Sequence, residues 1–419
     1  MASRTQKTER VVIRQAEADR LMAAHARFVA RRPGGRRMVQ RFAVMEGVDL
    51  SNQDLSDIDL TGSSLIGCKF DYSRLTRACL FGVDLQSSSL VGASLTQADL
   101  RGARLKGANL SHANLTQADL RAGRIAISDE DTRFSVLRHK VEAGQLDGAN
   151  VTGAVLDRSR LDDVSAAAAD FSECSMRGTK LVGANLKNAS LRGAMIDDVD
   201  VTGANLDSVD LTGAVLTRVD LSAARTRDLI LKGCLCDPTP EASQRAALLF
   251  VKLASHREWV ATGGKSGEPA ILDGEDLRPI AGLAGAFLTA VSARRACLAG
   301  VDLGRAALQG AILEGADLRG ASLRKADLRG ANLAGANLGQ ADLREALLGP
   351  LTLKGDREKP MRLDRASLRF ADLRDTALEG IDLDEADLHG ARRDAPVSLA
   401  PETPPVDATE PDDSFEVDS

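Results

Sequence analysis

The sequence predicts an all-β solenoid with square coils, and two features of one stretch carry this prediction. Between residues 95 and 120 a leucine recurs at every fifth position, and an alanine lies two places before each leucine from 100 onward. A helix repeats every 3.6 residues and a flat strand every 2.0, so neither accommodates a period of five. A chain that turns a corner after each short extended piece can have a period of five, and four such pieces close one coil. Residues 95–101 recur at 115–121, which agrees with a coil of 20 residues.

The residue before the leucine is usually Asp or Asn, as at Asp99 and Asn114. A short polar side chain at this place can hydrogen-bond to the backbone of each turn. The resulting pattern, A(D/N)LXX, covers well over half of the chain and resembles that of the pentapeptide-repeat proteins. The resemblance implies a right-handed quadrilateral β-helix.

The composition agrees with a solenoid. Aromatic residues make up 3% of the chain, which is too few for a conventional globular core of this length. A solenoid needs few, because each coil buries one leucine and one small residue per face against its neighbours. Each well-buried large apolar side chain should contribute about 1.5–3 kcal/mol. The core ladder we expect includes Leu50, Leu55, Leu60, Phe70, Leu100, Leu120, Phe171, Leu186, Leu206, Leu318, Leu328, Leu338 and Leu373.

The chain divides into five segments. Residues 1–46 form a basic N-terminal segment with a capping helix over 8–31, whose apolar stripe includes Ala18, Leu21, Met22, His25, Phe28 and Val29. Residues 47–236 form the first β-helix, and the pattern fails near 127–143, which predicts an inserted loop. Residues 237–282 form a helical insert, 283–391 the second β-helix with an excursion around 354–360, and 392–419 a disordered acidic tail.

The helical insert resembles the N-terminal helix, which suggests an internal duplication. Thr239, Pro240 and Glu241 are a good helix start, with a hydroxyl N-cap followed by proline and an acid in the first turn. Residues 25–30 align with 256–261, so Leu253, His256 and Trp259 take the places of Met22, His25 and Phe28. We therefore expect Leu21, His25, Phe28, Leu253, His256 and Trp259 to form two helical caps. The sequence leaves open whether the two repeat blocks form one continuous solenoid or two.

Charge is concentrated at the chain ends. Residues 1–46 contain 11 basic and 4 acidic residues, and 392–419 contain 2 basic and 8 acidic residues. Residues 47–126 are balanced with 8 of each sign, and the other two repeat blocks each carry a net charge of -3. The basic stretch 31–41 is either a site for an anionic partner or a solvated rim beside the cap. The N-terminus lacks an apolar signal segment and no stretch is apolar enough to cross a membrane, which predicts a cytoplasmic protein.

Nothing in the sequence predicts catalysis. No nucleophile elbow, phosphate loop or HExxH motif is present, and the repeated carboxylates are explained by the turns. Cys68, Cys174 and Cys234 occupy alanine positions, so a core role is favoured over metal binding by Cys234 and Cys236. No metal or other cofactor is expected.

The predicted function is therefore a non-catalytic scaffold that presents flat β-helix faces to a protein partner of unknown identity, without direct nucleic-acid binding. The insert, with Phe134, Arg138 and His139, is either a contact site or a tolerated loop, and Phe415 either a recognition motif or part of a solubilising tail. An exposed last coil near Leu388 predicts an end-to-end homodimer. The alternative, implied by the family resemblance, is a DNA-mimicking modulator of a type II topoisomerase such as gyrase. Mimicry relies on an acidic rod that copies phosphate charge, whereas the first repeat block is neutral.

Overall fold

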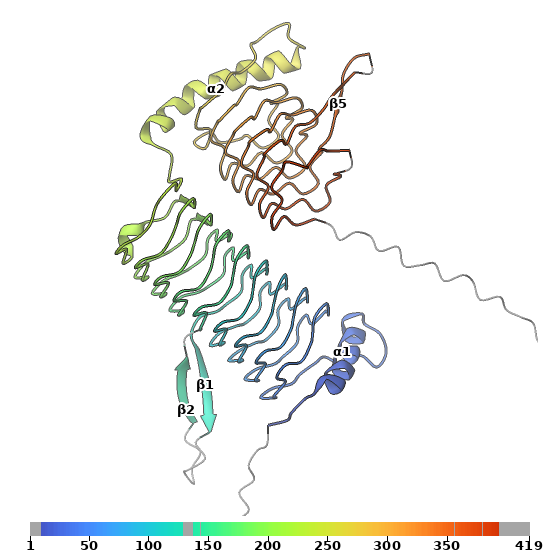
Figure 1. Ribbon diagram of the computed structural model, residues 1–419, viewed down its shortest axis with the longest axis vertical. Helices are drawn as coiled ribbons and strands as arrows, with labels where there is room; N and C mark the ends of the chain where they lie inside the picture. The colour runs from blue at the N-terminus through green and yellow to red at the C-terminus, as the bar shows by residue number, and fades with distance from the viewer. Residues whose placement is uncertain (1–9, 129–136, 143, 356, 379, 394–419) are drawn as a thin grey trace, which may run out of the picture.

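A computed structural model of the protein describes residues 10–128, 137–142, 144–355, 357–378 and 380–393 (Figure 1). Most of the parallel bridges join residues 20 apart along the chain, as between Asp49 and Lys69. These bridges run from Val39 to Leu235 and again from Ile271 to Arg392. We call these two sets of coils the N-terminal and the C-terminal β-helix. Their buried apolar side chains form two separate clusters. Both sets of coils begin before the predicted boundaries, because residues such as Met38 and Leu272 fill inward positions outside the regular leucine count.

One turn type explains the corners. Ala78 N donates to Leu75 O over 3.0 Å, and the second of the two residues between them, Arg77, has a φ of 57°. A positive φ at the third residue defines a type II turn, and the same conformation recurs every five residues, often at glycine. Asp99 Oδ1 accepts from Arg101 N and Asn114 Oδ1 from Thr116 N, which confirms the predicted role of the polar residue before leucine. Each coil therefore has four corners built by one local rule.

The extended pieces between corners are short. Most form single bridges, while β3 (Met195–Asp197) and β4 (Val215–Thr217) are parallel strands of three residues. Leu50 N donates to Lys69 O over 2.7 Å, and Lys69 N donates back to Val48 O over 2.9 Å. This ladder places the leucines above one another. Every residue of the predicted core ladder is buried, and the largest exposed fraction among them is 4%, at Leu206.

Helix α1 (Gln15–Val29) is shorter than the predicted helix over 8–31. Val12 pairs with Val44 as a parallel bridge, and Ile13 N donates to Val44 O over 2.8 Å. Residues 11–13 are therefore extended beside the first coils, where Ile13 becomes buried. The prediction of a helix at these positions was wrong because a strand partner, invisible in the local sequence, was available.

Helix α2 (Pro240–Ala261) begins as predicted. Thr239 Oγ1 accepts from Ala242 N over 3.3 Å, and Pro240 opens the helix. Leu249 and His256 are its buried residues, whereas Phe250 is 61% exposed. No helix in the described part of the chain has the length and apolar character to cross a membrane.

Two insertions project outward from the coils, and the coils before and after each insertion still stack on one another. The first is an antiparallel hairpin of β1 (Gly123–Ser128) and β2 (Leu137–Glu142), and the bridge from Arg104 to Gln145 closes the coil beneath it. The predicted loop near 127–143 thus includes strand, and Phe134 lies outside the described residues. The second contains β5 (Leu351–Thr352) and β6 (Glu358–Lys359), which pair at the predicted excursion. The 3-10 helix η1 (Leu221–Ala223) lies near the end of the N-terminal β-helix.

Candidate functional site

The two histidines predicted for the helical caps are both buried, and the Nδ1 atom of each accepts a backbone hydrogen bond. His25 is fully buried, its Nδ1 accepts from Met38 N over 3.2 Å, and its Nε2 lies 3.0 Å from Ser56 O. His256 is also fully buried and its Nδ1 accepts from Ala270 N over 3.0 Å. Nδ1 can accept a hydrogen bond only when it is unprotonated, so the folded protein stabilises the neutral form of both imidazole rings.

The aromatic residues predicted for the two helical caps are more exposed to solvent than the histidines. His25 stacks on Phe28 with ring centroids 5.7 Å apart, and His256 stacks on Trp259 at 5.6 Å. Phe28 is nevertheless 42% exposed, because α1 ends at the following residue. Leu21 and Leu253 are partly buried against the two cores. Each predicted cap thus lies at the start of a different β-helix.

Acidification should destabilise both helix docking sites. Burial lowers the pKa of His25 and of His256 below the ordinary 6.5, although hydrogen bonding to Ser56 and Thr289 acts in the opposite direction. Stability from the neutral rings is therefore complete above the unfolded-state pKa and is lost as the pH falls through the folded-state pKa. We expect the thermal midpoint to fall between about pH 7.5 and 5.5, and the double variant His25→Gln, His256→Gln to show a smaller fall. An equal fall in both proteins would contradict this assignment.

The cysteines are structural where they are buried. Cys174 is fully buried and its Sγ donates to Val151 O over 2.9 Å, and burial raises its pKa. Burial raises the pKa of Cys68 to about 11. Thiols with raised pKa are poor nucleophiles and poor metal ligands. Within the described ranges, no group of three His, Cys, Asp or Glu side chains is arranged to hold a metal ion.

A recurring ion pair neutralises many of the carboxylates that precede leucine. In the sequence Asp-Leu-Arg, the arginine reaches back two residues and holds both carboxylate oxygens. Arg101 Nε and Nη2 lie 2.9 and 2.7 Å from Asp99, and Arg344 lies 2.8 and 2.6 Å from Asp342. The same geometry occurs at Arg121, Arg278, Arg319, Arg329 and Arg374. Bidentate pairing of this kind leaves little uncompensated negative charge on these walls.

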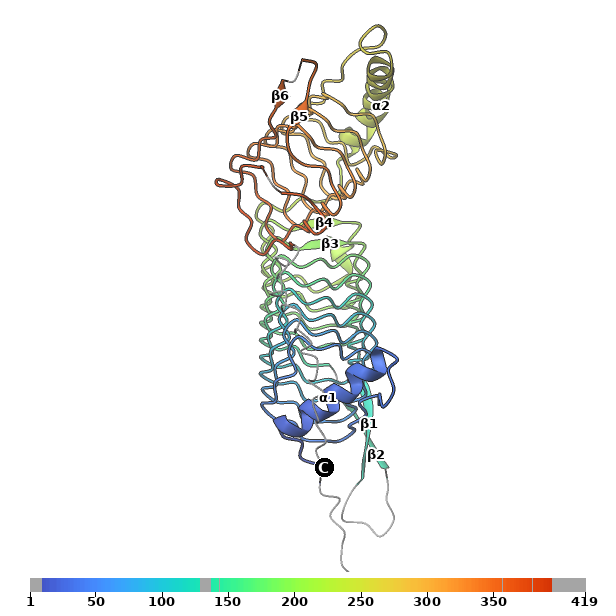
Figure 2. The same ribbon diagram turned by 90° about the vertical axis from the view of Figure 1, so that its right-hand side faces the viewer.

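The two β-helices meet along one corner of each, in opposite coil order, and we call this meeting the lateral contact (Figure 2). Glycine carbonyls in the N-terminal β-helix accept from side chains of the C-terminal one. Arg319 donates to Gly213 O over 2.6 Å, Gln340 to Gly193 O over 2.6 Å, and Arg392 to Gly153 O over 3.3 Å. In the reverse direction, Arg177 donates to Gly320 O over 2.6 Å. The contact is therefore largely polar, in contrast to the leucine cores on either side of it.

The aromatic ring of Phe370 fills one end of the lateral contact. The ring of Phe370 stacks on His112 at 5.3 Å and meets the edge of His389 at 5.6 Å. A Cβ atom on Gly153 would lie 2.3 Å from that ring, and one on Gly390 would lie 2.6 Å from it. The ring fits because both neighbouring corners are glycine.

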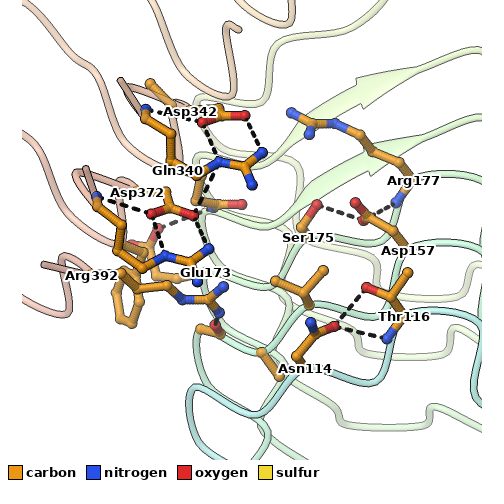
Figure 3. Close-up of a pocket in the computed structure, with 17 residues that line it drawn as sticks. Asn114, Thr116, Asp157, Glu173, Ser175, Arg177, Gln340, Asp342, Asp372 and Arg392 are labelled. Atoms are coloured by element: carbon orange, nitrogen blue, oxygen red, sulfur yellow. Dashed lines mark hydrogen bonds and ion pairs between the residues drawn. The ribbon is translucent and has the colours of Figure 1, made fainter. Parts of the chain in front are cut away.

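A cavity of about 270 Å³ opens beside the lateral contact (Figure 3). Asp157, Ser175 and Arg177 line it from the N-terminal β-helix, and Asp372 and Arg392 face them from the C-terminal one. Its remaining polar lining includes Asn114, Thr116, Glu173, Gln340, Asp342, Arg344 and Arg374. The cavity is thus polar, mixed in charge and built by both halves of the chain.

Burial shifts the titration of two groups in this cavity. It raises the pKa of Glu173, against the opposing charge of Arg369, whose Nε lies 3.7 Å away. It also lowers the pKa of Arg392, against the opposing effect of the nearby Asp372 carboxylate. Both groups line the cavity between the two β-helices.

Sequence reasoning did not identify the lateral contact. Arg177, Gln340 and Arg392 occupy variable outward positions, and Phe370 stands at a corner where glycine or a polar residue is common. Phe370 was the available signal, since a large aromatic side chain at a corner position needs a partner surface. The predicted ladder and cap residues support the scaffold and do not line the cavity.

The comparisons with known proteins concern the repeat. The family model for pentapeptide repeats matches residues 43–80, 78–117, 145–178, 169–207, 196–225, 311–349 and 362–392. The comparison with curated proteins finds no match.

Among solved structures, the chain is similar to QnrB1, a plasmid-mediated fluoroquinolone resistance protein, at 20% identity over 52% of this chain and 87% of that one, with a TM-score of 0.24. It is similar to HetL, a protein involved in heterocyst differentiation regulation from the cyanobacterium Nostoc sp. strain PCC 7120. That match has 20% identity, covers 90% of this chain and 96% of that one, and has a TM-score of 0.15. A protein of the Arabidopsis thaliana thylakoid lumen matches at 23% identity over 40% of this chain and 66% of its own, with a TM-score of 0.10.

Proposed function

This chain belongs to the pentapeptide-repeat family, and from this premise we propose that it is a non-catalytic scaffold that binds a protein partner through the outer surface of its coils. Members of the family are generally structural or interaction proteins. The observation that carries the proposal is that two aromatic rings are held on the outside of the N-terminal β-helix, at opposite corners of its coils. Phe42 is 50% exposed and Tyr72 is 67% exposed, in a chain with one tyrosine.

Glycine corners hold these rings in place. A Cβ atom on Gly62 would lie 2.5 Å from the ring of Phe42, and one on Gly92 would lie 2.7 Å from the ring of Tyr72. Each ring therefore packs one edge against the glycine of the next coil, and it loses little conformational entropy when a partner covers it. Rigid exposed aromatic side chains are frequent anchors of protein interfaces. This arrangement favours a binding role over a purely architectural one.

The experiment is affinity capture from the native host with the full chain and with the variants Phe42→Ala and Tyr72→Ala. Ser87→Ala is the matched control, since Ser87 also occupies a corner with positive φ but carries no ring. We expect at least one aromatic variant to lose a protein that the control retains. Failure of the wild-type chain to retain any protein above background would sink the scaffold proposal.

The second candidate, a DNA-mimicking modulator of gyrase, is less well supported by the surface. The bidentate pairs of Asp99 with Arg101 and of Asp119 with Arg121 neutralise carboxylates on one wall of the N-terminal β-helix. A phosphate mimic needs uncompensated negative charge at regular spacing. We expect the purified protein at about micromolar concentration to leave gyrase supercoiling unchanged. Inhibition or protection in that assay would restore the mimic.

We further propose that α1 and α2 cap the two β-helices, each of which has its own hydrophobic core. This proposal is supported by the equivalent burial of His25 and His256 beneath the two helices. In the last described coil, Leu378, Leu383 and Leu388 are partly exposed. These apolar side chains at the end of the coils support the homodimer, for which light scattering should give twice the monomer mass of 44.3 kDa. A monomer at all concentrations would exclude it.

A further inference from the structure

Four arginines at the C-terminal end of α1 lack a carboxylate partner. We call them the arginine cluster, and they are Arg27, Arg31, Arg32 and Arg36. All four are exposed, and none forms a side-chain hydrogen bond or an ion pair with a residue that the structure describes. Many exposed arginines of the coils differ, since they reach a carboxylate, as Arg77 reaches Asp57 at 2.6 Å. The cluster therefore carries uncompensated positive charge.

Backbone hydrogen bonds hold the arginine cluster in one compact turn. Arg32 N donates to Arg27 O over 2.8 Å, and Gly35 N donates to Arg32 O over 3.2 Å. Arg36 N then donates back to Ala24 O over 3.0 Å, so the chain folds against the end of α1. Gly35 packs against the α1 backbone with no room for a Cβ atom. The four side chains thus leave from a short segment of fixed backbone.

The end of α1 offsets only part of this charge. The C-terminus of a helix carries about half an elementary negative charge, which leaves most of the cluster uncompensated. The carboxylates of α1 lie in its N-terminal half, where Asp19 accepts from Gln15 over 2.8 Å. Beside the cluster, Phe28 is 42% exposed and Val29 is 37% exposed. This surface fits a partner with several carboxylates and an apolar side chain.

The chain itself contains a segment of this chemistry. Residues 394–419, which we call the acidic segment, lie outside the described residues and contain 8 acidic residues and no basic one. Phe415 is flanked by four of these acids, at positions 412, 413, 416 and 418. Because the cluster and the acidic segment share one chain, their effective concentration is about millimolar, which an untethered polyanion such as a nucleic acid must exceed.

The acidic segment starts within reach of the arginine cluster. Arg392 donates to Gly153 O over 3.3 Å, which places this end of the C-terminal β-helix against the N-terminal one. The coil of Gly153 is about five coil spacings, or about 24 Å, from that of Arg37. Glu410 follows Arg392 by 18 residues, which span up to about 60 Å when extended. The carboxylates around Phe415 can therefore reach the cluster.

We propose that the acidic segment binds the arginine cluster of the same chain, with its carboxylates on the guanidinium groups and Phe415 on the apolar surface of Phe28 and Val29. The acidic segment then links the last coil of the C-terminal β-helix to the start of the N-terminal one, which strengthens the lateral contact. This role is separate from the proposed binding of a protein partner at Phe42 and Tyr72.

The test uses the full chain with most of the charge of the acidic segment removed, which we call the neutralised chain. It carries Asp407→Asn, Glu410→Gln, Asp412→Asn, Asp413→Asn, Glu416→Gln and Asp418→Asn. The probe is a fluorescent peptide with the natural sequence of residues 401–419. Fluorescence anisotropy should show saturable binding to the neutralised chain below about 1 mM, and about tenfold weaker binding to the wild type, whose own segment competes. Raising the salt from about 50 to about 300 mM should weaken binding to the neutralised chain by about tenfold.

Two triple variants of the neutralised chain separate the cluster from net charge. The first removes most of the cluster through Arg31→Gln, Arg32→Gln and Arg36→Gln. The matched control removes the same charge from exposed corners of the C-terminal β-helix through Arg295→Gln, Arg305→Gln and Arg365→Gln. We expect about tenfold weaker peptide binding for the first and unchanged affinity for the control.

Four outcomes would overturn the proposal. They are absence of saturable peptide binding to the neutralised chain, equal affinities of the two triple variants, equal affinities of the wild type and the neutralised chain, and tighter binding of a DNA single strand of about 20 nucleotides than of the peptide. Light scattering adds a fifth, since the binding within one chain predicts the same mass before and after neutralisation. A fall in mass on neutralisation would assign the acidic segment to a second copy and would likewise overturn it.

Discussion

Replacement of Phe171 by alanine is expected to destabilise the N-terminal β-helix by about 3–5 kcal/mol, the usual cost of removing a large buried aromatic side chain. Phe171 is fully buried among leucines of the adjacent coils, and the backbone ladder holds those coils at a fixed spacing. Ladder hydrogen bonds restrict the collapse of coils around a void, so the cavity term adds to the lost transfer free energy. The effect should be confined to one half of the molecule because the two cores are separate.

The measurement uses two probes in a urea titration. Far-UV circular dichroism reports on both β-helices, whereas fluorescence of the one tryptophan, Trp259 on α2, reports on the C-terminal half. We expect Phe171→Ala to shift an early part of the dichroism transition and to leave the fluorescence midpoint nearly unchanged. Tyr72→Ala is the control, since a side chain that is 67% exposed should change stability by about 0.5 kcal/mol or less. Equal shifts in both probes would mean that the halves unfold together.

Replacement of Gly153 by alanine is expected to open the lateral contact. Gly153 has a φ of 65°, and a Cβ atom there would lie 2.3 Å from the ring of Phe370. Overpacking of this kind costs about 1–3 kcal/mol, which is comparable to the few hydrogen bonds that hold the contact. Gly148→Ala separates this effect from backbone strain, because Gly148 has a φ of 62° and nothing within 4 Å of its Cβ position.

Small-angle X-ray scattering measures the result. The radius of gyration should increase for Gly153→Ala and stay at the wild-type value for Gly148→Ala. Adding Phe370→Ala to Gly153→Ala should restore much of the closed form, since it removes the atoms in conflict. If Gly153→Ala scattered as the wild type does, the ring would have an alternative position and the contact would not depend on the glycine.

The period of five was enough to predict the repeat fold, because a single local rule builds every corner. Leucine at 50 and 100 and the polar residues at 99 and 114 each take the role that their position in the repeat predicts. Prediction failed where a distant segment decided the local structure. Residues 11–13 are extended and not helical because Val44 offers a bridge, which local periodicity does not reveal.

The cavity was beyond prediction for a related reason. Arg177 and Arg392 occupy outward positions where the repeat tolerates almost any residue, so their hydrogen bonds to glycine carbonyls of the other β-helix have no periodic signal. The direction of the second β-helix relative to the first depends on the segment around α2, whose path the leucine count does not specify. The repeat pattern therefore predicts the surface of each β-helix separately, and it does not predict how the two surfaces contact each other.

The hydrogen bond between Gly153 and Arg392 joins residues that are 239 positions apart, so Gly153 is synthesised well before Arg392. At about 5–20 residues per second, a ribosome delivers Arg392 about 12–48 seconds after Gly153 has been made. The N-terminal β-helix can complete its coils during that interval, while the surface that the C-terminal β-helix later covers is still open to solvent or to a chaperone. A protein that binds the nascent chain can therefore reach that surface only until translation of the chain is complete.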